Sequence, residues 1–283
     1  MRETRRLLIA IWQNIVYTEY LPLVLGEAGI EKFGLAPRDV VWPLYDSGTD
    51  ATLSVEFAAA AFRFGHSQVS GEKLTFSTVS SGNVDIGSNI FYADSLYQKG
   101  ASVSTLANGM ITNPAMAVDR QFSFPIRHQI FEFRGRPGSG VDLVALNIQR
   151  GRDVGLPPYN DVRELTGAQR AGSFDDLAVD IGEDNVELLK KVYETVDDID
   201  LYTGLLLEKV VAADAIIGPT GAHIIGEQFH NLKFGDRFFY ENWNFVGPLT
   251  DEEYRAVRDF KLAKLLCSNI PDMRVLPQNP FDL

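Results

Sequence analysis

A helix without a polar side constrains this chain more than any other sequence feature. The segment ATLSVEFAAAAFRFGH, residues 51–66, carries four consecutive alanines, Ala58 to Ala61, among valine and phenylalanine side chains. A surface helix keeps a polar face, so a helix that is hydrophobic nearly all round is predicted to be buried. We therefore expect the chain to fold around this segment, with other elements covering it.

Other segments are predicted to form the covering helices. Residues 3–22 place apolar side chains at helical spacing, and Pro22 is predicted to close that helix. The segment that begins at residue 218 forms a helix that stops near Gly235. Residues 184–196 form another, whose apolar side chains share one face: Leu188, Leu189, Val192 and Val196.

The remaining segments indicate loops and two more helical stretches. Residues 248–269 open with a capping box, in which the side chains of Thr250 and Glu253 each bond the other's backbone N–H. Residues 115–133 are predicted to be helical apart from Pro125, and GRPGSG (135–140) is predicted to be a flexible turn. Residues 31–50 resemble a loop, and residues 70–115 receive no assignment. Strand-like alternation is scarce, so the predicted fold class is mainly α.

Composition limits the classes of partner. The 283 residues carry a net charge of -12, which repels nucleic acids and anionic lipids. We expect no membrane span, because the apolar stretch LLIAIWQNIVY is interrupted by Gln13 and Asn14.

Cys267 is the single cysteine, which rules out an internal disulfide and favours a reducing compartment. There is no Asn-x-Ser/Thr sequon or signal peptide, and the charged start MRETRRLL suggests a chain that begins inside a domain.

His66 stands at the end of the predicted buried helix. Arg63 and Phe62 lie one turn before it, and Gly65 is its neighbour. Because glycine lets a flat group approach the backbone, this set suits a planar, apolar cofactor with carboxylate tails. The alternative is a core histidine at a helix end, where a cation is mildly favoured.

The other candidates for metal or nucleophilic chemistry are weaker. His128 lies in a mixed segment, and His223 and His230 share a helix face without an evident third ligand, so core or surface roles are predicted. The motifs HExxH, GxSxG and GxGxxG and the phosphate-binding loop are absent.

A second block places polar residues directly after an apolar run. In LNIQRGRDVGLPPYNDVR, residues 146–163, the amide of Asn147 is followed by Arg150 and Arg152. This order favours either an anionic group or a group that needs a fixed amide.

These blocks together resemble the animal haem peroxidase family (the myeloperoxidase, peroxidasin and peroxinectin type). The other matching blocks follow in the family's order: EYLPLVLG, AAFRFGHS, IGPTGAHIIGEQFHNLKFGDRFFYE and LLCSN. The resemblance covers nearly the whole chain, and it identifies residues 1–283 as the C-terminal portion of the family's catalytic domain, without its distal half.

The resemblance implies a role for each matching residue. His66 is the axial ligand of the iron of haem b, and Asn147 accepts a hydrogen bond from His66, which fixes the imidazole close to neutral. Arg63, Gly65 and Arg150 bind the cofactor, the two arginines near its propionates. The implied reaction is reduction of hydrogen peroxide coupled to oxidation of an unidentified donor, by an extracellular protein. Arg152 and Asp153 are predicted instead to form an internal ion pair that holds the turn.

The chain also departs from the family pattern. Val154 replaces the histidine of RGRDHG, and His223 stands where a cysteine is frequent, which leaves Cys267 without its expected disulfide partner. The family's distal histidine and arginine, its calcium loop and the carboxylates that esterify haem belong to the N-terminal half. No catalytic acid or base of the distal side is therefore expected here, and the 283 residues alone are predicted to be a poor peroxidase.

Two other functions within the same resemblance stay open. One is a non-catalytic haem or adhesion module of the peroxinectin type, although no Arg-Gly-Asp tripeptide occurs. The other is a fatty-acid dioxygenase, whose chemistry uses a tyrosine where this chain has Arg63.

Overall fold

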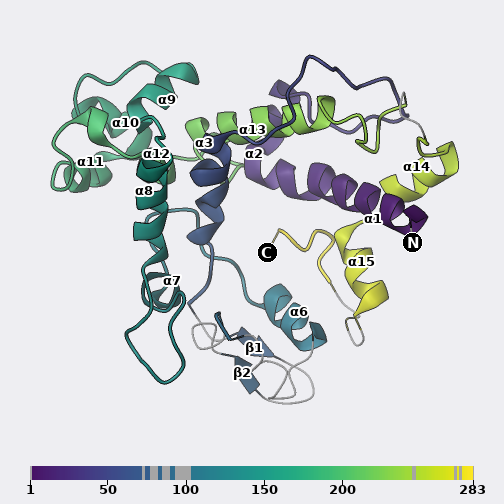
Figure 1. Ribbon diagram of the computed structural model, residues 1–283, viewed down its shortest axis with the longest axis horizontal. Coiled ribbons are helices and arrows are strands. Elements are labelled where there is room, and N and C mark those ends of the chain that lie inside the picture. Colours follow the sequence, from purple (N-terminus) through teal and green to yellow (C-terminus); the bar gives the residue numbers. More distant parts are fainter. Residues whose placement is uncertain are drawn as a thin grey trace.

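The computed structural model describes residues 2–71, 74–76, 82–84, 90–92, 103–243, 247–270, 273 and 276–282, and these form a mainly helical fold, as predicted (Figure 1). The one described sheet is an antiparallel pair, β1 (Leu74–Phe76) and β2 (Gly82–Val84), in which Thr75 pairs with Asn83. It lies in the segment left unassigned from the sequence. The helix α6 (Val103–Thr112) also lies there.

The N-terminal helix continues through its proline. After α1 (Arg2–Ile15) come the π-helical turn η1 (Val16–Tyr20) and then α2 (Leu21–Lys32), with Pro22 in the first turn of α2. The prediction that Pro22 closes the helix is therefore wrong. In the first turn of a helix the backbone N–H has no partner within that helix, so a proline there loses no hydrogen bond. The wider π turn before Pro22 leaves room between the proline ring and the preceding carbonyl groups.

Length and composition make residues Glu3–Lys32 together a candidate for crossing a membrane, with 39% of the apolar window buried inside the fold. The interruption at Gln13 and Asn14 is thus not sufficient to exclude a span. That no segment spans a membrane stays a prediction.

The predicted buried helix is buried on one side only, because Val55, Ala58 and Phe62 are exposed, and it is not continuous. It consists of α3 (Val55–Ala59) and the 3₁₀ helix η2 (Ala61–His66), separated at Ala60, where φ is −133°. Ala60 and Phe64 are at most 2% exposed. At the break, Nε of Arg63 bonds the carbonyl of Ala58 over 3.0 Å, an acceptor that a continued α-helix would use.

Three long-range neighbours surround η2. They are α8 (Leu143–Asp153), which packs on α3, and α12 (Leu201–Leu207) and α13 (Pro219–Phe234), which both contact η2 (Figure 1). Asp142 caps α8 by accepting from the N–H of Val144 over 2.8 Å, and α13 ends at Gly235, as predicted. Local caps thus fix where the helices that carry the site begin and end.

The remaining elements are short. They are α7 (Phe124–His128), α9 (Tyr159–Leu165), η3 (Asp175–Leu177), α10 (Ala178–Ile181), α11 (Glu183–Leu189), η4 (Val196–Asp198), α14 (Asp251–Arg258) and α15 (Leu262–Asn269). The capping box of Thr250 and Glu253 is confirmed at the start of α14, with both hydrogen bonds present.

Two predicted helices are much shorter than expected. Of residues 115–133 only α7 is helical, and before it Asp119 accepts from the N–H of Gln121, which stabilises a turn instead. The helix over 184–196 ends at Leu189, so Val192 is 73% exposed while Leu189 is buried. Side chains beyond the end of the helix no longer follow its spacing.

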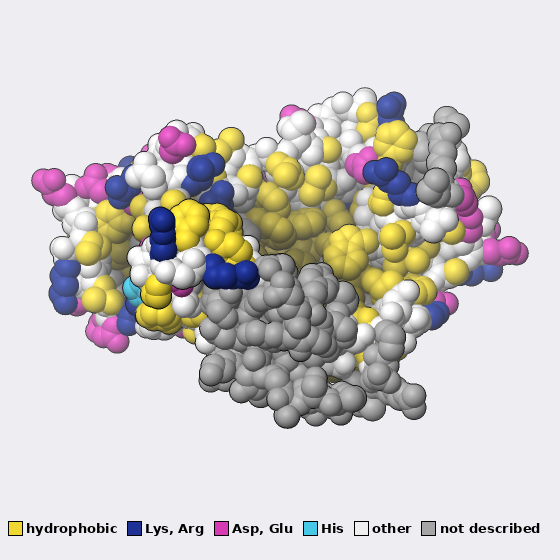
Figure 2. Space-filling model, turned by 60° about the horizontal axis from the view of Figure 1, so that its bottom comes forward, with side chains coloured by type: hydrophobic (Ala, Val, Ile, Leu, Met, Phe, Trp, Pro, Cys, Tyr) yellow, Lys and Arg dark blue, Asp and Glu magenta, His cyan; other side chains and the backbone are white. Residues whose placement is uncertain are grey.

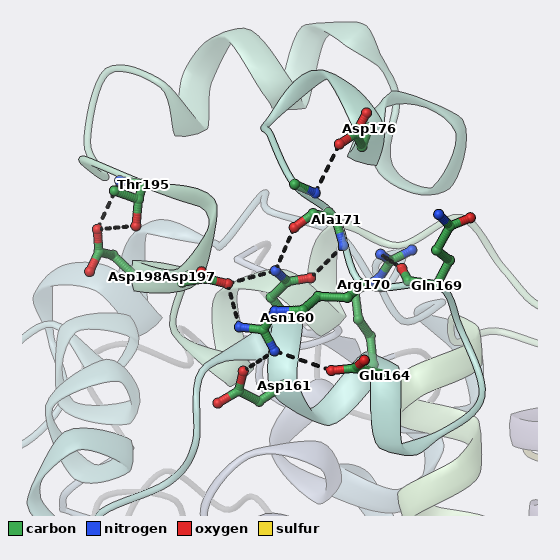
Figure 3. A network of polar contacts seen from close by, with 12 residues as sticks. Asn160, Asp161, Glu164, Gln169, Arg170, Ala171, Asp176, Thr195, Asp197 and Asp198 are labelled. Atoms are coloured by element: carbon green, nitrogen blue, oxygen red, sulfur yellow. Dashed lines mark hydrogen bonds and ion pairs between the residues drawn. The ribbon is translucent and has the colours of Figure 1, made fainter.

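Asn160 joins α9 to the lobe that contains residues 168–198 (Figure 3). Its Nδ2 donates to the carbonyl of Ala171 over 2.9 Å and to Asp197 over 2.7 Å, and its Oδ1 accepts from the N–H of Ala171 over 3.0 Å. Arg170 bridges the same Asp197 to α9 through Asp161. The fully buried amide of Asn160 thus uses both of its terminal atoms to hold α9 against this lobe.

Substituting Gly204 tests how tightly α12 is held. A Cβ at Gly204 would lie 2.1 Å from the ring of Tyr159, so Gly204→Ala should lower the free energy of unfolding by about 1–3 kcal/mol, measured by urea denaturation. Gly221→Ala is the control, because its Cβ would meet only Ile217 at 3.8 Å. It should leave the stability unchanged or raise it by up to about 1 kcal/mol. Equal effects of the two substitutions would contradict the close approach.

Candidate functional site

The structure brings His66 and Asn147 together. Although they are 81 residues apart, Nδ1 of His66 and Nδ2 of Asn147 are separated by 2.8 Å, which confirms that their side chains lie within hydrogen-bonding distance. Asn147 is fully buried on α8, and His66 is half-buried at the end of η2. The 3₁₀ geometry of η2 places Arg63 on the same side as His66, but not Phe62, which corrects the predicted shared face.

The amide of Asn147 is oriented by Arg63. Nη1 of Arg63 donates to Oδ1 of Asn147 over 2.9 Å, so the amide presents its NH₂ group to His66. Asn147 therefore donates to Nδ1 in this arrangement, whereas the predicted role was that of acceptor. The reason is that Arg63 has only donors and occupies the oxygen.

Tyr202 also belongs to the site, and no pattern in the sequence indicated it. Its hydroxyl donates to the carbonyl of Arg63 over 3.4 Å and also hydrogen-bonds the side chain of Asn147. Burial raises the pKa of Tyr202 well above its usual value, so the phenol keeps its proton. Tyr202 thus ties α12 to both η2 and α8.

The charges of Arg63 and Arg150 repel each other, and neither side chain pairs with a carboxylate among the described residues. Burial lowers the pKa of Arg63, and the charge of Arg150 lowers it further. Arg150 is exposed and makes no hydrogen bond or ion pair with any described residue, and Arg63 bonds only Ala58 and Asn147 among them. A carboxylate bound between the two arginines would relieve this repulsion.

The surroundings of His66 leave room for a flat group. A Cβ at Gly65 would meet only Gln68, at 3.7 Å, and Nε2 of His66 has no hydrogen-bond partner in the described ranges. Burial lowers the pKa of His66, and the charge of Arg63 lowers it further, which favours the neutral imidazole. A neutral histidine, two cations without a carboxylate partner among the described residues and an open backbone fit a haem with propionate groups, once the Asn147 amide is turned over.

Arg152 is paired, but with a different partner from the predicted one. Its Nε and Nη2 bind both oxygens of Asp200, over 2.9 and 2.7 Å. The ion pair therefore joins the end of α8 to the start of α12, and Asp153 takes no part in it. Asp200 also accepts from the hydroxyl of Tyr193, so the bridge is part of a small network.

The other histidines have local roles. Nδ1 of His230 lies 2.8 Å from the carbonyl of Phe33, His223 lies 3.5 Å from Glu227 on its own helix, and His128 is exposed beside Phe124. Cys267 is exposed and free. None of these histidines is near Asn147, so they do not compete with His66 for its role.

One face of the molecule is hollowed at its centre, and hydrophobic side chains line the hollow, with Lys and Arg side chains on both sides of it (Figure 2). Exposed apolar side chains elsewhere in the described ranges include Leu8 and Trp12 on α1, at 54% and 52%. An apolar hollow of this kind indicates a binding face.

The sequence profile named "Animal haem peroxidase" matches residues 2–281. The chain belongs to the animal haem peroxidase family. It is 46% identical to "Heme peroxidase 2" of Caenorhabditis elegans, over 98% of this chain and 39% of that protein. The "Chorion peroxidase" of Drosophila melanogaster is 36% identical, over 95% of this chain and 33% of its own length.

Solved structures agree with this family of folds. Peroxidase A from Dictyostelium discoideum superposes with a TM-score of 0.79 at 30% identity, over 98% of this chain and 50% of that chain. A fatty acid alpha-dioxygenase of Arabidopsis thaliana has a TM-score of 0.73 at 19% identity, a likeness of fold alone. This animal haem peroxidase chain thus spans half or less of the relatives named here.

Proposed function

We propose that residues 1–283 form the proximal part of a haem peroxidase domain, with His66 as the axial ligand of haem b. The observation that carries the proposal is the proximity of His66 and Asn147, with Nδ1 and Nδ2 2.8 Å apart, beside Arg63 and the exposed Arg150. When bound, haem supplies the redox chemistry that reduces hydrogen peroxide and oxidises a donor. The chain's own residues hold and orient that group.

Each residue has a distinct task in this proposal. Nε2 of His66 binds the iron, and Asn147 fixes the plane and the tautomer of the imidazole through Nδ1. Arg63 and Arg150 bind the propionates, and Gly65 admits the edge of the ring. By resemblance to the family, the acid–base groups that act on peroxide and the calcium site belong to the part of the relatives outside the match.

Location and membrane contact are also proposals. We propose an extracellular protein, since relatives in two insects are named chorion peroxidase. Residues 3–32 are proposed to be core helix rather than a span, because Tyr17, Leu21 and Val24 pack in the core and Asn14 makes buried polar bonds.

Replacing Asn147 tests the proposal. In the full-length protein supplied with haem, Asn147→Ala should lower haem affinity or peroxidase activity about 10–100-fold, because the imidazole loses the partner that orients it. Affinity is measured by haem transfer to apomyoglobin, and activity by peroxide-dependent oxidation of a dye.

Gln149→Ala, at an exposed position of the same helix, is the matched control and should leave both quantities unchanged. Unchanged affinity and activity in Asn147→Ala would count against the proximal pair. Haem uptake by the unmodified protein without oxidation of any donor would favour the non-catalytic haem or adhesion module.

A further inference from the structure

The side-chain amide of Asn147 lies between Arg63 and His66, and both of these residues could use its oxygen as an acceptor. Arg63 can only donate, and it occupies Oδ1 at 2.9 Å, while His66 lies 2.8 Å from Nδ2. If the amide turned over, Oδ1 would face His66, but the NH₂ group would then face the guanidinium, donor against donor. Both neighbours cannot therefore have the oxygen while Arg63 stays in place.

The orientation of the amide decides which nitrogen of His66 carries the proton. With Nδ2 facing it, Nδ1 has to accept, so the single proton of the neutral ring is on Nε2. A metal ligand that binds through Nε2 needs the opposite tautomer, with Nδ1–H donating to an acceptor. In the arrangement observed, the protein holds His66 in the tautomer that cannot bind iron through Nε2.

We propose that Arg63 is a positioning residue that sets the tautomer of His66 through Asn147, and that an anion which draws Arg63 away releases the amide and frees Nε2. The proton count does not change in this step. Nε2 gives a proton to water, Nδ1 takes one from water, and the amide rotates about its Cβ–Cγ bond.

The surroundings allow the side chain of Arg63 to move without its backbone. The hydroxyl of Tyr202 binds the carbonyl of Arg63, and the N–H of Arg63 donates to Ala60 over 3.0 Å, so η2 is anchored by its main chain. Arg150, which is exposed and adjacent, repels Arg63 and attracts the same anions. A carboxylate placed between the two would therefore gain two cations and take Arg63 from Asn147.

The inference deepens the proposed function in one respect only. That the anion is a haem propionate rests on the proposed function, whereas control of the tautomer by Arg63 does not. The two can therefore be tested separately, with and without a porphyrin.

The first test needs no cofactor. Histidine-selective ¹⁵N NMR of the full-length protein at about pH 8, above the pKa of imidazole, shows which ring nitrogen carries the proton. The signals of His66 are identified by their loss in His66→Gln. We expect the Nε2–H form to dominate by about 10-fold or more in the unmodified protein, and the ratio to fall below about 3-fold in Arg63→Met.

Two further variants make this test decisive. Arg150→Met removes the neighbouring cation, which does not touch Asn147, and should leave the ratio unchanged. Asn147→Asp offers only acceptors and should give Nδ1–H whether or not Arg63 is present. An unmodified protein that is already Nδ1–H, or Arg63→Met with the ratio of the unmodified protein, would overturn the inference.

The second test uses protoporphyrin without iron, which carries both propionates but cannot ligate histidine. Binding of the free acid should shift His66 toward Nδ1–H, and its dimethyl ester should not. Equal shifts with acid and ester would overturn the role of the anion. If neither porphyrin binds, the proposed function fails, and the Arg63→Met comparison still decides whether Arg63 sets the tautomer.

Discussion

Replacing His66 by alanine should abolish histidine ligation of haem in the full-length protein and weaken haem binding by at least about 100-fold. Loss of a residue that merely supports a metal ligand costs about 10–100-fold in affinity, so loss of the ligand itself should cost more. The structure gives no substitute, because none of the other three histidines lies beside Asn147. The measurement is the visible spectrum with resonance Raman detection of the iron–histidine vibration.

His128→Ala is the matched control for that result. His128 is exposed on α7, and its ring lies tilted beside that of Phe124, with centroids 4.6 Å apart. Its loss should leave the spectrum and the affinity unchanged. A histidine-ligated spectrum that survives in His66→Ala would place the ligand elsewhere and contradict the proposed site.

Replacing Glu241 by alanine should lower the free energy of unfolding by about 3–5 kcal/mol, because it leaves the charge of Lys233 buried without a counter-ion. Both side chains of this pair are 1% exposed, and Nζ lies 3.1 Å from Oε2. Burial lowers the pKa of Lys233, and the charge of Glu241 opposes that shift. Nζ also donates to the carbonyl of Ala36, so the pair fixes the loop after α2 against α13.

Chemical denaturation of two further variants separates charge from packing. The double substitution Lys233→Met with Glu241→Gln removes both charges, keeps the volume, and should cost less than Glu241→Ala alone. Lys190→Ala breaks two ion pairs whose carboxylates are 77% and 64% exposed, and it should cost less than about 1 kcal/mol. If Glu241→Ala were as stable as Lys190→Ala, the prediction would be contradicted, because the charge of Lys233 would then not need Glu241 as its counter-ion.

The pair of His66 and Asn147 shows what a family resemblance adds to a sequence. Helical spacing relates residues within one element, and it could not place two residues 81 positions apart at 2.8 Å. The matching blocks predicted that proximity, and the structure confirms it. The roles of Gly65, Arg63 and Arg150 toward a cofactor stay predictions.

The atom-level arrangement of the site could not be predicted from either source. That Arg63 holds the oxygen of Asn147, and that Tyr202 from α12 binds both residues, follow from how the three elements η2, α8 and α12 pack. The same holds for Arg152, whose partner Asp200 is brought by α12 rather than by the adjacent Asp153. A short-range sequence pattern contains no information about a partner that a distant element supplies.

The sequence by itself determined the features that depend on neighbouring residues. These are the mainly helical class, the burial of Ala59 to Ala61, the capping box of Thr250 and Glu253, and the end of α13 at Gly235. Only the tertiary structure decided where a helix continues or breaks against its local preference, as at Pro22 and Ala60, and which way the amide of Asn147 points. Caps and apolar runs act within a few residues of the sequence. A carbonyl or amide oxygen without a local partner instead accepts a hydrogen bond from a donor that the packed fold places beside it.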